Sequence, residues 1–234
     1  MKKVIFFIFL LFFTYLYAEK SKIFSYIPFK SAEWTSKITT ESPSENVTLI
    51  QNVFYKENKM RIEGKDNKGN QYITIIDNKY VYIINPKEKQ GVKYPIMSKQ
   101  NPEKNNIELN KCREKAKKAG NEKINNKNCE IYEFDCTIDG IKFKIKEWKS
   151  IKDNFVIKTE TFYEKTKTIN EIVDLKPGVK ISDNKFIPDK NINFINMENM
   201  MLDTITKTKK SGKRADEKKI KEMMNNFMKN QDSE

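Results

Sequence analysis

The feature that most constrains this chain is a succession of short strand-like runs joined by turns of only a few residues. The run "QYITII" (Gln71–Ile76) is followed by Asp77-Asn78-Lys79, by "YVYIIN" (Tyr80–Asn85) and by an Asn85-Pro86 turn. Apolar runs of this length, rich in Ile, Val and Tyr and bounded by Asn, Asp and Pro, are typical of β-strands. Connections this short join antiparallel neighbours, because a parallel pair needs a crossover of a dozen or more residues. The first half of the chain is therefore predicted to be an antiparallel meander.

The second half continues this pattern, most clearly in "IKFKIKEW". Ile141, Phe143 and Ile145 alternate with lysines, which predicts a strand with one buried and one solvated face. Altogether we expect about ten antiparallel strands. The expected strands are Ser31–Glu41, Asn46–Tyr55, Met60–Gly64, Gln71–Ile76, Tyr80–Asn85, Gly91–Ile96, Asn128–Ile138, Ile141–Trp148, Phe155–Glu164 and Thr168–Leu175.

One helix is expected in the middle of the chain, from the cap residue Asn101 to Gly120. Asn followed by Pro favours a helix start, and Gly favours a helix end. A narrow apolar stripe at helical spacing predicts that this helix lies on the sheet with one face only. The stripe consists of Leu109, Cys112, Ala116 and Ala119.

The N-terminus predicts export. Lys2 and Lys3 precede an apolar core of ten residues, Val4–Phe13, and Tyr17-Ala18 offers a cleavage site. This order of segments is that of a cleaved secretory signal peptide over residues 1–18. The apolar core is shorter than the roughly 20 residues that a membrane-spanning helix needs. We therefore expect an exported protein of the bacterial periplasm.

The charge of the exported chain is strongly basic, (45 − 2) − 32 = +11 after loss of Lys2 and Lys3. Export argues against nucleic acid as a partner. The lysines are scattered through every segment, which favours a solvated surface, with attraction to anionic lipid headgroups as the alternative. The chain has no His and only 7 Gly, so it offers neither a His-based triad or metal site nor a Gly-rich phosphate loop. We expect no catalytic residue, metal or cofactor, and a monomer that is not an enzyme.

Three cysteines in an exported chain allow one disulfide and one free thiol. Cys129 and Cys136 are seven residues apart in one predicted strand, too far to bond to each other, and have opposite parity. The remaining pairings are Cys112–Cys129 and Cys112–Cys136. We predict the first; three reduced thiols are the further alternative.

The order of these pieces resembles the outer-membrane lipoprotein carrier family, the LolA-like proteins of the bacterial periplasm. The likeness extends over "VFYKENKMRIEG", "IIDNKYVYIINPKEKQGVKYP", the helix, "CEIYEFDCTIDGIKFKIKEW" and "ISDNKFIP", whose Phe186-Ile187-Pro188 is similar to the family's last strand. The resemblance implies a mainly β fold, an incomplete (half-open) antiparallel β-barrel whose concave face is covered by helices. It also implies a half-barrel domain over residues 19–190 and leaves a tail at 191–234.

The resemblance further implies an apolar cavity that holds the acyl chains of a lipid or lipoprotein. Lys56 stands where the family typically has an Arg that holds a helical lid, so it is the expected lid contact, although Lys lacks the planar fork of Arg. The two tryptophans, Trp34 and Trp148, suit the cavity or the core. The expected cavity wall is Val47, Leu49, Val53, Met60, Ile62, Ile73, Ile75, Val81, Ile83 and Trp148.

The function that the resemblance implies is that of a periplasmic carrier during lipoprotein sorting to the outer membrane. The alternative is a non-enzymatic envelope interaction or sensor module that binds a protein partner through a sheet edge or the C-terminal helix. A carrier purifies with lipid, whereas an interaction module does not.

The tail carries an apolar helix face of its own. Ile220, Met223, Met224, Phe227 and Met228 fall at i, i+3, i+4, i+7 and i+8, which predicts an amphipathic helix. One interpretation is that this face packs on the protein's own sheet. The other is that the methionines cover the cavity mouth or dock on an anionic membrane surface or partner.

Overall fold

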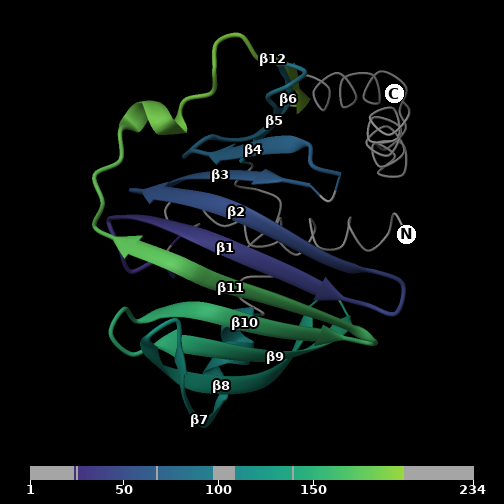
Figure 1. Cartoon of the computed structure of the whole chain (residues 1–234), viewed down its shortest axis with the longest axis vertical. Helices are drawn as coiled ribbons and strands as arrows, with labels where there is room; N and C mark the ends of the chain where they lie inside the picture. The colour runs from purple at the N-terminus through teal and green to yellow at the C-terminus, as the bar shows by residue number, and fades with distance from the viewer. Residues whose placement is uncertain (1–23, 25, 67, 97–108, 139, 198–234) are drawn as a thin grey trace, which may run out of the picture. The chain divides into compact units, whose positions relative to one another are not determined.

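A computed structural model describes residues 24, 26–66, 68–96, 109–138 and 140–197 of the chain. Its strands form one sheet in the order β12-β6-β5-β4-β3-β2-β1-β11-β10-β9-β8-β7 (Figure 1). From β6 to β7, every neighbouring pair in this order is antiparallel. The sheet ends at β12 on one side and at β7 on the other. The predicted mainly β, antiparallel fold with an open rather than closed sheet is therefore confirmed.

The strands follow the sequence signals closely in most places. Gln71–Ile76 and Tyr80–Asn85 have the predicted bounds. The full set is β1 Ser31–Glu41, β2 Asn46–Lys56, β3 Lys59–Lys65, β4 Gln71–Ile76, β5 Tyr80–Asn85, β6 Gln90–Pro95, β7 Lys117–Ile124, β8 Lys127–Ile138, β9 Ile141–Ser150, β10 Phe155–Tyr163, β11 Thr166–Pro177 and β12 Asn193–Asn196. Within the described residues, helical structure is found at 109–114, in the 3-10 helix η1, Asp183–Phe186, and at Met197.

The turns explain why the strands end where they do. Asp77 Oδ1 accepts hydrogen bonds from the backbone N–H groups of Lys79 and Tyr80, at 2.6 and 2.7 Å. Asn85 Oδ1 accepts from Lys87 and Glu88 in the same way, at 3.1 and 3.2 Å. Short Asp and Asn side chains close such turns by bonding their own backbone. The Asp77 and Asn85 turns read from the sequence therefore fix the ends of β4 and β5.

The helix prediction is wrong at its C-terminal end. The helical segment ends at residue 114, and the chain then enters β7, Lys117–Ile124. Gly120 has φ +149° and lies where the β7–β8 register shifts. It is thus the glycine of a β-bulge rather than a helix end. Ala119, expected on the apolar helix stripe, is an exposed residue of β7.

The region after β11 also differs from its prediction. Residues Asp183–Phe186 of "ISDNKFIP" form η1 instead of a last strand. A short strand, β12, follows at Asn193–Asn196 in what was expected to be polar tail. The chain divides into two compact units at Phe194/Ile195. The predicted signal peptide, the predicted helix start at Asn101 and the predicted C-terminal helix lie outside the described residues.

Most buried apolar side chains of the described residues fall into two clusters. Cluster 1 is the larger, and its buried members are Phe24, Ile27, Ala32, Trp34, Val53, Tyr55, Met60, Ile62, Ile76, Val81, Ile96, Cys129, Ile131, Trp148, Phe155, Ile157 and Ile172. Cluster 2 consists of Leu109, Phe134, Cys136, Phe143 and Ile145, with partly buried Cys112, Ala116, Ile138, Ile141 and Tyr163 against it. The helical stripe predicted at Leu109, Cys112 and Ala116 therefore does pack on the sheet.

The predicted disulfide is wrong, and the second pairing, Cys112–Cys136, is the one that forms, with Cα atoms 5.4 Å apart. Successive side chains of a strand point to opposite sides, and the β8–β9 register has no shift. Cys129 therefore lies in cluster 1, where it is a buried free thiol, whereas Cys136 lies in cluster 2 beneath the segment that carries Cys112. The prediction that the two cysteines point to opposite sides of β8 is confirmed. The pairing was wrong because both sides of β8 are buried, one side near Cys129 and the other near Cys136.

Candidate functional site

Strand register separates the expected cavity residues into two sets. Cross-strand partners in an antiparallel sheet share a face. Val53 pairs with Ile62, Ile62 with Thr74, and Thr74 with Ile83. This row defines one side of the sheet at β2 to β5, called here the cluster-1 face. Seven of the expected residues lie on it: Val47, Leu49, Val53, Met60, Ile62, Val81 and Ile83.

Members of the cluster-1 face differ in exposure. Val53, Met60, Ile62 and Val81 are buried in cluster 1, and the half-buried Ile83 packs against it. Val47 and Leu49 lie further along β2 and are also half-buried. Trp148 is buried in cluster 1 from β9, as is Trp34 from β1. The face therefore has a closed centre with half-exposed apolar positions around it.

The chain just before β1 covers part of cluster 1. The Phe24 ring meets Tyr55 edge-on at 5.6 Å, and Phe29 meets Phe155 at 5.4 Å. Trp34 joins the same group, with its ring centroid 5.9 Å from that of Phe155. Edge-to-face contacts at these distances are favourable beyond simple burial of area. A short N-terminal segment is thus one wall of the apolar interior.

Ile73 and Ile75 lie on the opposite face of the sheet. Ile75 pairs with Arg61 on one side and Tyr82 on the other, whereas Ile73 pairs with Glu63 and Ile84. This side is called the cleft face, because it carries a cleft of about 370 Å³. The cleft is lined by Arg61, Ile73, Ile84, Pro86, Lys89, Ile187, Asp189, Asn191 and Ile192.

The segment that carries η1 crosses the cleft face. It leaves β11 and passes β2, β3 and β4 (Figure 1), with contacts between η1 and β3. Arg61 donates to the Lys185 carbonyl at 3.2 Å, and Lys185 pairs with Glu63 at 2.9 Å. Burial opposes ionisation of Glu63, but Lys185 and Arg61 outweigh it and hold the pKa of Glu63 below its ordinary value. Charged side chains thus help to attach this segment, and its Phe186 is buried as well.

Lys56, the expected lid contact, lies at the end of β2 near the same segment. Its Nζ donates to the Ile181 carbonyl at 3.2 Å and lies 3.1 Å from Asp183 Oδ2. Lys59 also approaches Asp183, at 3.4 Å. These contacts connect Lys56 to the start of η1. The role of Lys56 as a lid contact stays a prediction.

A row of polar residues interrupts the cluster-1 face. Ser36 pairs with Gln51, Gln51 with Gly64, and Gly64 with Tyr72. On one side of this row lie Ile38 and Leu49, and on the other Trp34, Val53, Ile62, Thr74 and Ile83. The sequence does carry a signal for this row, which the prediction missed. Ser36, Gln51 and Gly64 stand where the alternation of each strand would place an apolar residue.

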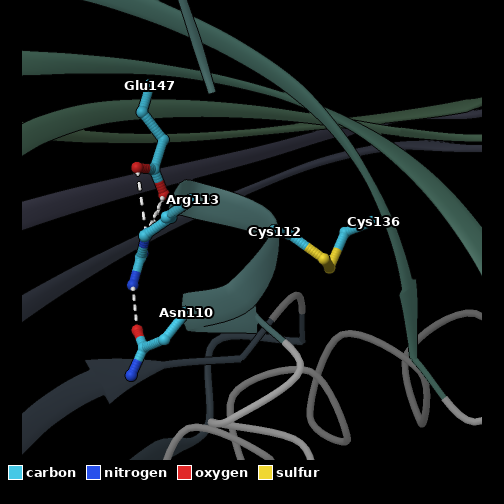
Figure 2. Close-up of a disulfide and its surroundings, with 5 residues drawn as sticks. All are labelled: Asn110, Cys112, Arg113, Cys136 and Glu147. Carbon is cyan, nitrogen blue, oxygen red and sulfur yellow. Dashed lines mark hydrogen bonds and ion pairs between the residues drawn. A yellow bond between two sulfur atoms is a disulfide. The ribbon is translucent and has the colours of Figure 1, made fainter. Parts of the chain in front are cut away.

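Figure 2 shows how the helical turn at 109–114 is attached to the sheet. On one side of the helical turn Cys112 reaches Cys136 through the disulfide, and on the other Arg113 reaches Glu147. Arg113 Nη2 donates to Glu147 Oε1 at 2.7 Å, and its Nε lies 3.1 Å from both carboxylate oxygens. The Glu147 side chain is only 6% exposed, so this carboxylate depends on the guanidinium fork for its partners.

Sequence reasoning missed Arg113, although a signal was present. Of the 45 basic residues only Arg61, Arg113 and Arg214 are arginines. Arg61 and Arg113 both place the guanidinium against a carboxylate, Glu63 at 2.6 Å and Glu147 at 2.7 Å. In a chain that otherwise uses lysine, an arginine indicates a position where two donors in a fixed fork are needed.

No group of three or more His, Cys, Asp or Glu side chains that could hold a metal ion occurs among the residues described here. In the same part of the chain, no helix has the length and apolar character needed to span a membrane.

Comparisons with known proteins give structural neighbours only. No protein-family model and no curated protein matches the chain. An uncharacterized conserved protein from Thermus thermophilus is 12% identical, with a TM-score of 0.50, over 76% of this chain and 94% of that one. This likeness shows a shared fold.

Two further solved structures are similar at lower TM-scores. A LolA superfamily protein from Nitrosomonas europaea is 10% identical over 73% of this chain and 95% of that one, with a TM-score of 0.40. A chain of the Pseudomonas aeruginosa MucA/MucB complex is 8% identical over 70% of this chain and 58% of that one, with a TM-score of 0.46. The first carries the name of the family that the sequence resembles.

Proposed function

We propose that this protein is an exported, non-enzymatic carrier of lipid or lipoprotein in the bacterial envelope, and that acyl chains lie against the cluster-1 face. The observation that carries the proposal is the apolar face itself. Buried aliphatic and aromatic side chains from distant strands form one cluster, with half-buried Phe29, Tyr72, Ile83, Tyr94, Ile124 and Leu175 around it. Apolar surface that continues past a closed core in this way suits a ligand without charge.

The sequence supports the same proposal independently. The signal-like residues 1–18 favour export, and the order of motifs resembles a family that carries lipoproteins between membranes. In that setting the lysine-rich surface suits approach to anionic headgroups. The cleft on the opposite face is lined in part by Arg61, Lys89 and Asp189, so it suits an acyl chain less well.

An interaction module is the second candidate, and strand β7 favours it. β7 stands at one end of the sheet order, and most of its residues are exposed. An edge strand offers backbone groups to which a partner can add a strand. Lys117, Lys118 and Lys123 lie along it, and edge lysines are a common device against unwanted pairing. These lysines would favour a protein partner with acidic side chains at this edge.

Native mass spectrometry of the full chain, exported by a bacterial host and purified without detergent, tests the proposal. We expect a polypeptide mass that lacks Met1–Ala18, together with lipid adducts that disappear after solvent extraction. A preparation that carries no lipid and retains a stoichiometric protein partner would contradict the carrier and favour the interaction module.

A further inference from the structure

The cluster-1 face contains one buried polar atom that the fold leaves without a hydrogen-bond partner. This atom is Gln51 Oε1, and it is the only buried side-chain nitrogen or oxygen of the described residues in this state. Gln51 is 7% exposed. Buried carbonyl oxygens are almost always paired in folded proteins, because losing water without gaining a partner is unfavourable. An unpaired oxygen on the face proposed to hold a ligand therefore calls for an explanation.

The neighbours of Gln51 hold its side chain in place without using this oxygen. Gln51 Nε2 donates to the Tyr72 hydroxyl at 2.5 Å. Ser36, the partner of Gln51 on β1, donates its hydroxyl proton to Asn170 Oδ1 at 2.6 Å. The carboxamide is thus anchored through its nitrogen, and its oxygen remains as an acceptor.

Gly64 is what lets Tyr72 reach Gln51 across an intervening strand. A Cβ placed on Gly64 would lie 2.6 Å from the Tyr72 hydroxyl oxygen and 2.7 Å from the ring carbon that bears it. Any larger residue would displace the ring. Burial raises the pKa of Tyr72, although its bond with Gln51 acts the other way, which agrees with a hydroxyl held away from water. Three strands therefore cooperate to position one amide.

The apolar rows on both sides of this amide define what can meet it. Leu49 precedes Gln51 on the same face of β2, and Val53 follows it. A ligand lying along this face would place hydrocarbon on Leu49 and Val53 and one polar group at Gln51. The free group is an acceptor, so the matching ligand group is a donor, an N–H or an O–H.

We propose that Gln51, oriented by Tyr72 across Gly64, is the polar recognition point of the acyl-chain face and accepts a hydrogen bond from an amide N–H or hydroxyl next to the acyl chain. This inference rests on the proposed carrier function and specifies its ligand class. An N-acyl amide satisfies the oxygen. A simple ester, which has no donor, leaves it unpaired.

The test compares two probes of similar length, palmitamide and methyl palmitate, bound to the delipidated full chain and measured by displacement of a fluorescent fatty acid. We expect the wild-type protein to bind palmitamide about tenfold more tightly than methyl palmitate, the difference that one well-placed hydrogen bond makes. Gln51→Leu should abolish this preference while still binding both probes. Tyr72→Phe should reduce it, because Gln51 loses its anchor.

The matched control is Asn52→Ala, the next residue of β2, which is exposed and points to the other face. It should keep the wild-type preference. Equal binding of the two probes by the wild type, or tighter binding of the ester, would overturn the assignment of Gln51 and leave the carrier proposal standing. Failure of the wild type to bind either probe would contradict the proposed function itself.

Discussion

Clusters 1 and 2 bury apolar side chains in two different ways. Cluster 2 is small, and the segment over it is fixed by a disulfide and by a guanidinium fork on Glu147. Cluster 1 is larger, and its described aromatic and aliphatic members meet through packing. A packing contact can be replaced by a contact with another apolar group, whereas a disulfide and a bidentate ion pair each need one particular partner. Cluster 2 therefore has a structural role. Under the proposed function, cluster 1 is the part of the apolar interior where a ligand can bind and leave.

Removal of the disulfide should have the largest effect on stability. The cysteines are 24 residues apart, and closing a loop of that length contributes roughly 3 kcal/mol to the free energy of unfolding. We expect Cys112→Ser with Cys136→Ser to lose about this amount in urea unfolding, with lipid occupancy retained because cluster 1 is untouched.

The free thiol Cys129 supplies the control for that experiment. Cys129→Ala keeps the disulfide and removes one sulfur from cluster 1, so its loss of stability should be clearly smaller. A bond between Cys112 and Cys129 in a non-reducing peptide map would contradict the β8 assignment on which the comparison is built.

Replacement of Arg113 should come second in size. Arg113→Leu leaves the buried Glu147 carboxylate without its charged partner, and loss of hydrogen bonds to a charged group costs about 2 kcal/mol. Arg113→Lys restores the charge but not the fork and should recover only part of this loss. A Glu147→Gln background should make the Arg113 substitution much milder. If Arg113→Leu cost the same in both backgrounds, the fork would not be what holds this segment.

The sequence was a good guide to the strands where local signals and tertiary pairing agree. Short apolar runs bounded by Asp or Asn turns predicted β4 and β5, and the structure keeps both. β7 was missed because "KKAGNEKI" has no apolar alternation; its strand conformation comes from pairing with β8. Gly120 misleads a prediction from sequence, because a bulge glycine and a capping glycine look alike there.

The candidate site could be predicted only in part. Alternation shows which residues of one strand share a face, but it does not show which face of the next strand, beyond the turn, they match. Ile76 pairs with Val81, so odd-numbered residues of β5 share a face with even-numbered residues of β4. The set Ile73, Ile75, Val81 and Ile83 assumed the reverse and therefore spans two faces. Gln51 escaped notice for another reason: an unpaired oxygen is a property of the folded surroundings.

The smallest expected effect on stability comes from an acid-sensitive contact next to cluster 1. Asp153 accepts hydrogen bonds from Lys127 Nζ at 2.7 Å and from Ser150 Oγ at 2.8 Å. Burial opposes its ionisation, but these two donors outweigh burial and hold the pKa of Asp153 below its ordinary value of 3.8. A carboxyl whose pKa is lower in the folded state contributes fully above its unfolded pKa and loses that contribution as pH falls through the folded value.

We therefore expect the melting temperature to fall as pH is lowered below about 3.8, and Asp153→Asn to flatten this part of the profile. The Cys112–Cys136 bond does not titrate, so the double serine variant should keep the wild-type slope in the same range. An identical slope for wild type and Asp153→Asn would remove Asp153 from this account.

The most direct measurement compares one enlarged residue on each face of the sheet. Ile83 lies on the cluster-1 face and Ile73 on the cleft face, and both are half-buried in neighbouring strands. Displacement of a fluorescent fatty acid from the delipidated full chain should show Ile83→Trp weakening binding about tenfold, which is about 1.4 kcal/mol of binding free energy. The overpacking cost to the stability of the fold should stay modest, at about 1 to 3 kcal/mol. Ile73→Trp should bind as the wild type does. A larger loss in Ile73→Trp, or wild-type binding in Ile83→Trp, would contradict the claim that acyl chains lie on the cluster-1 face.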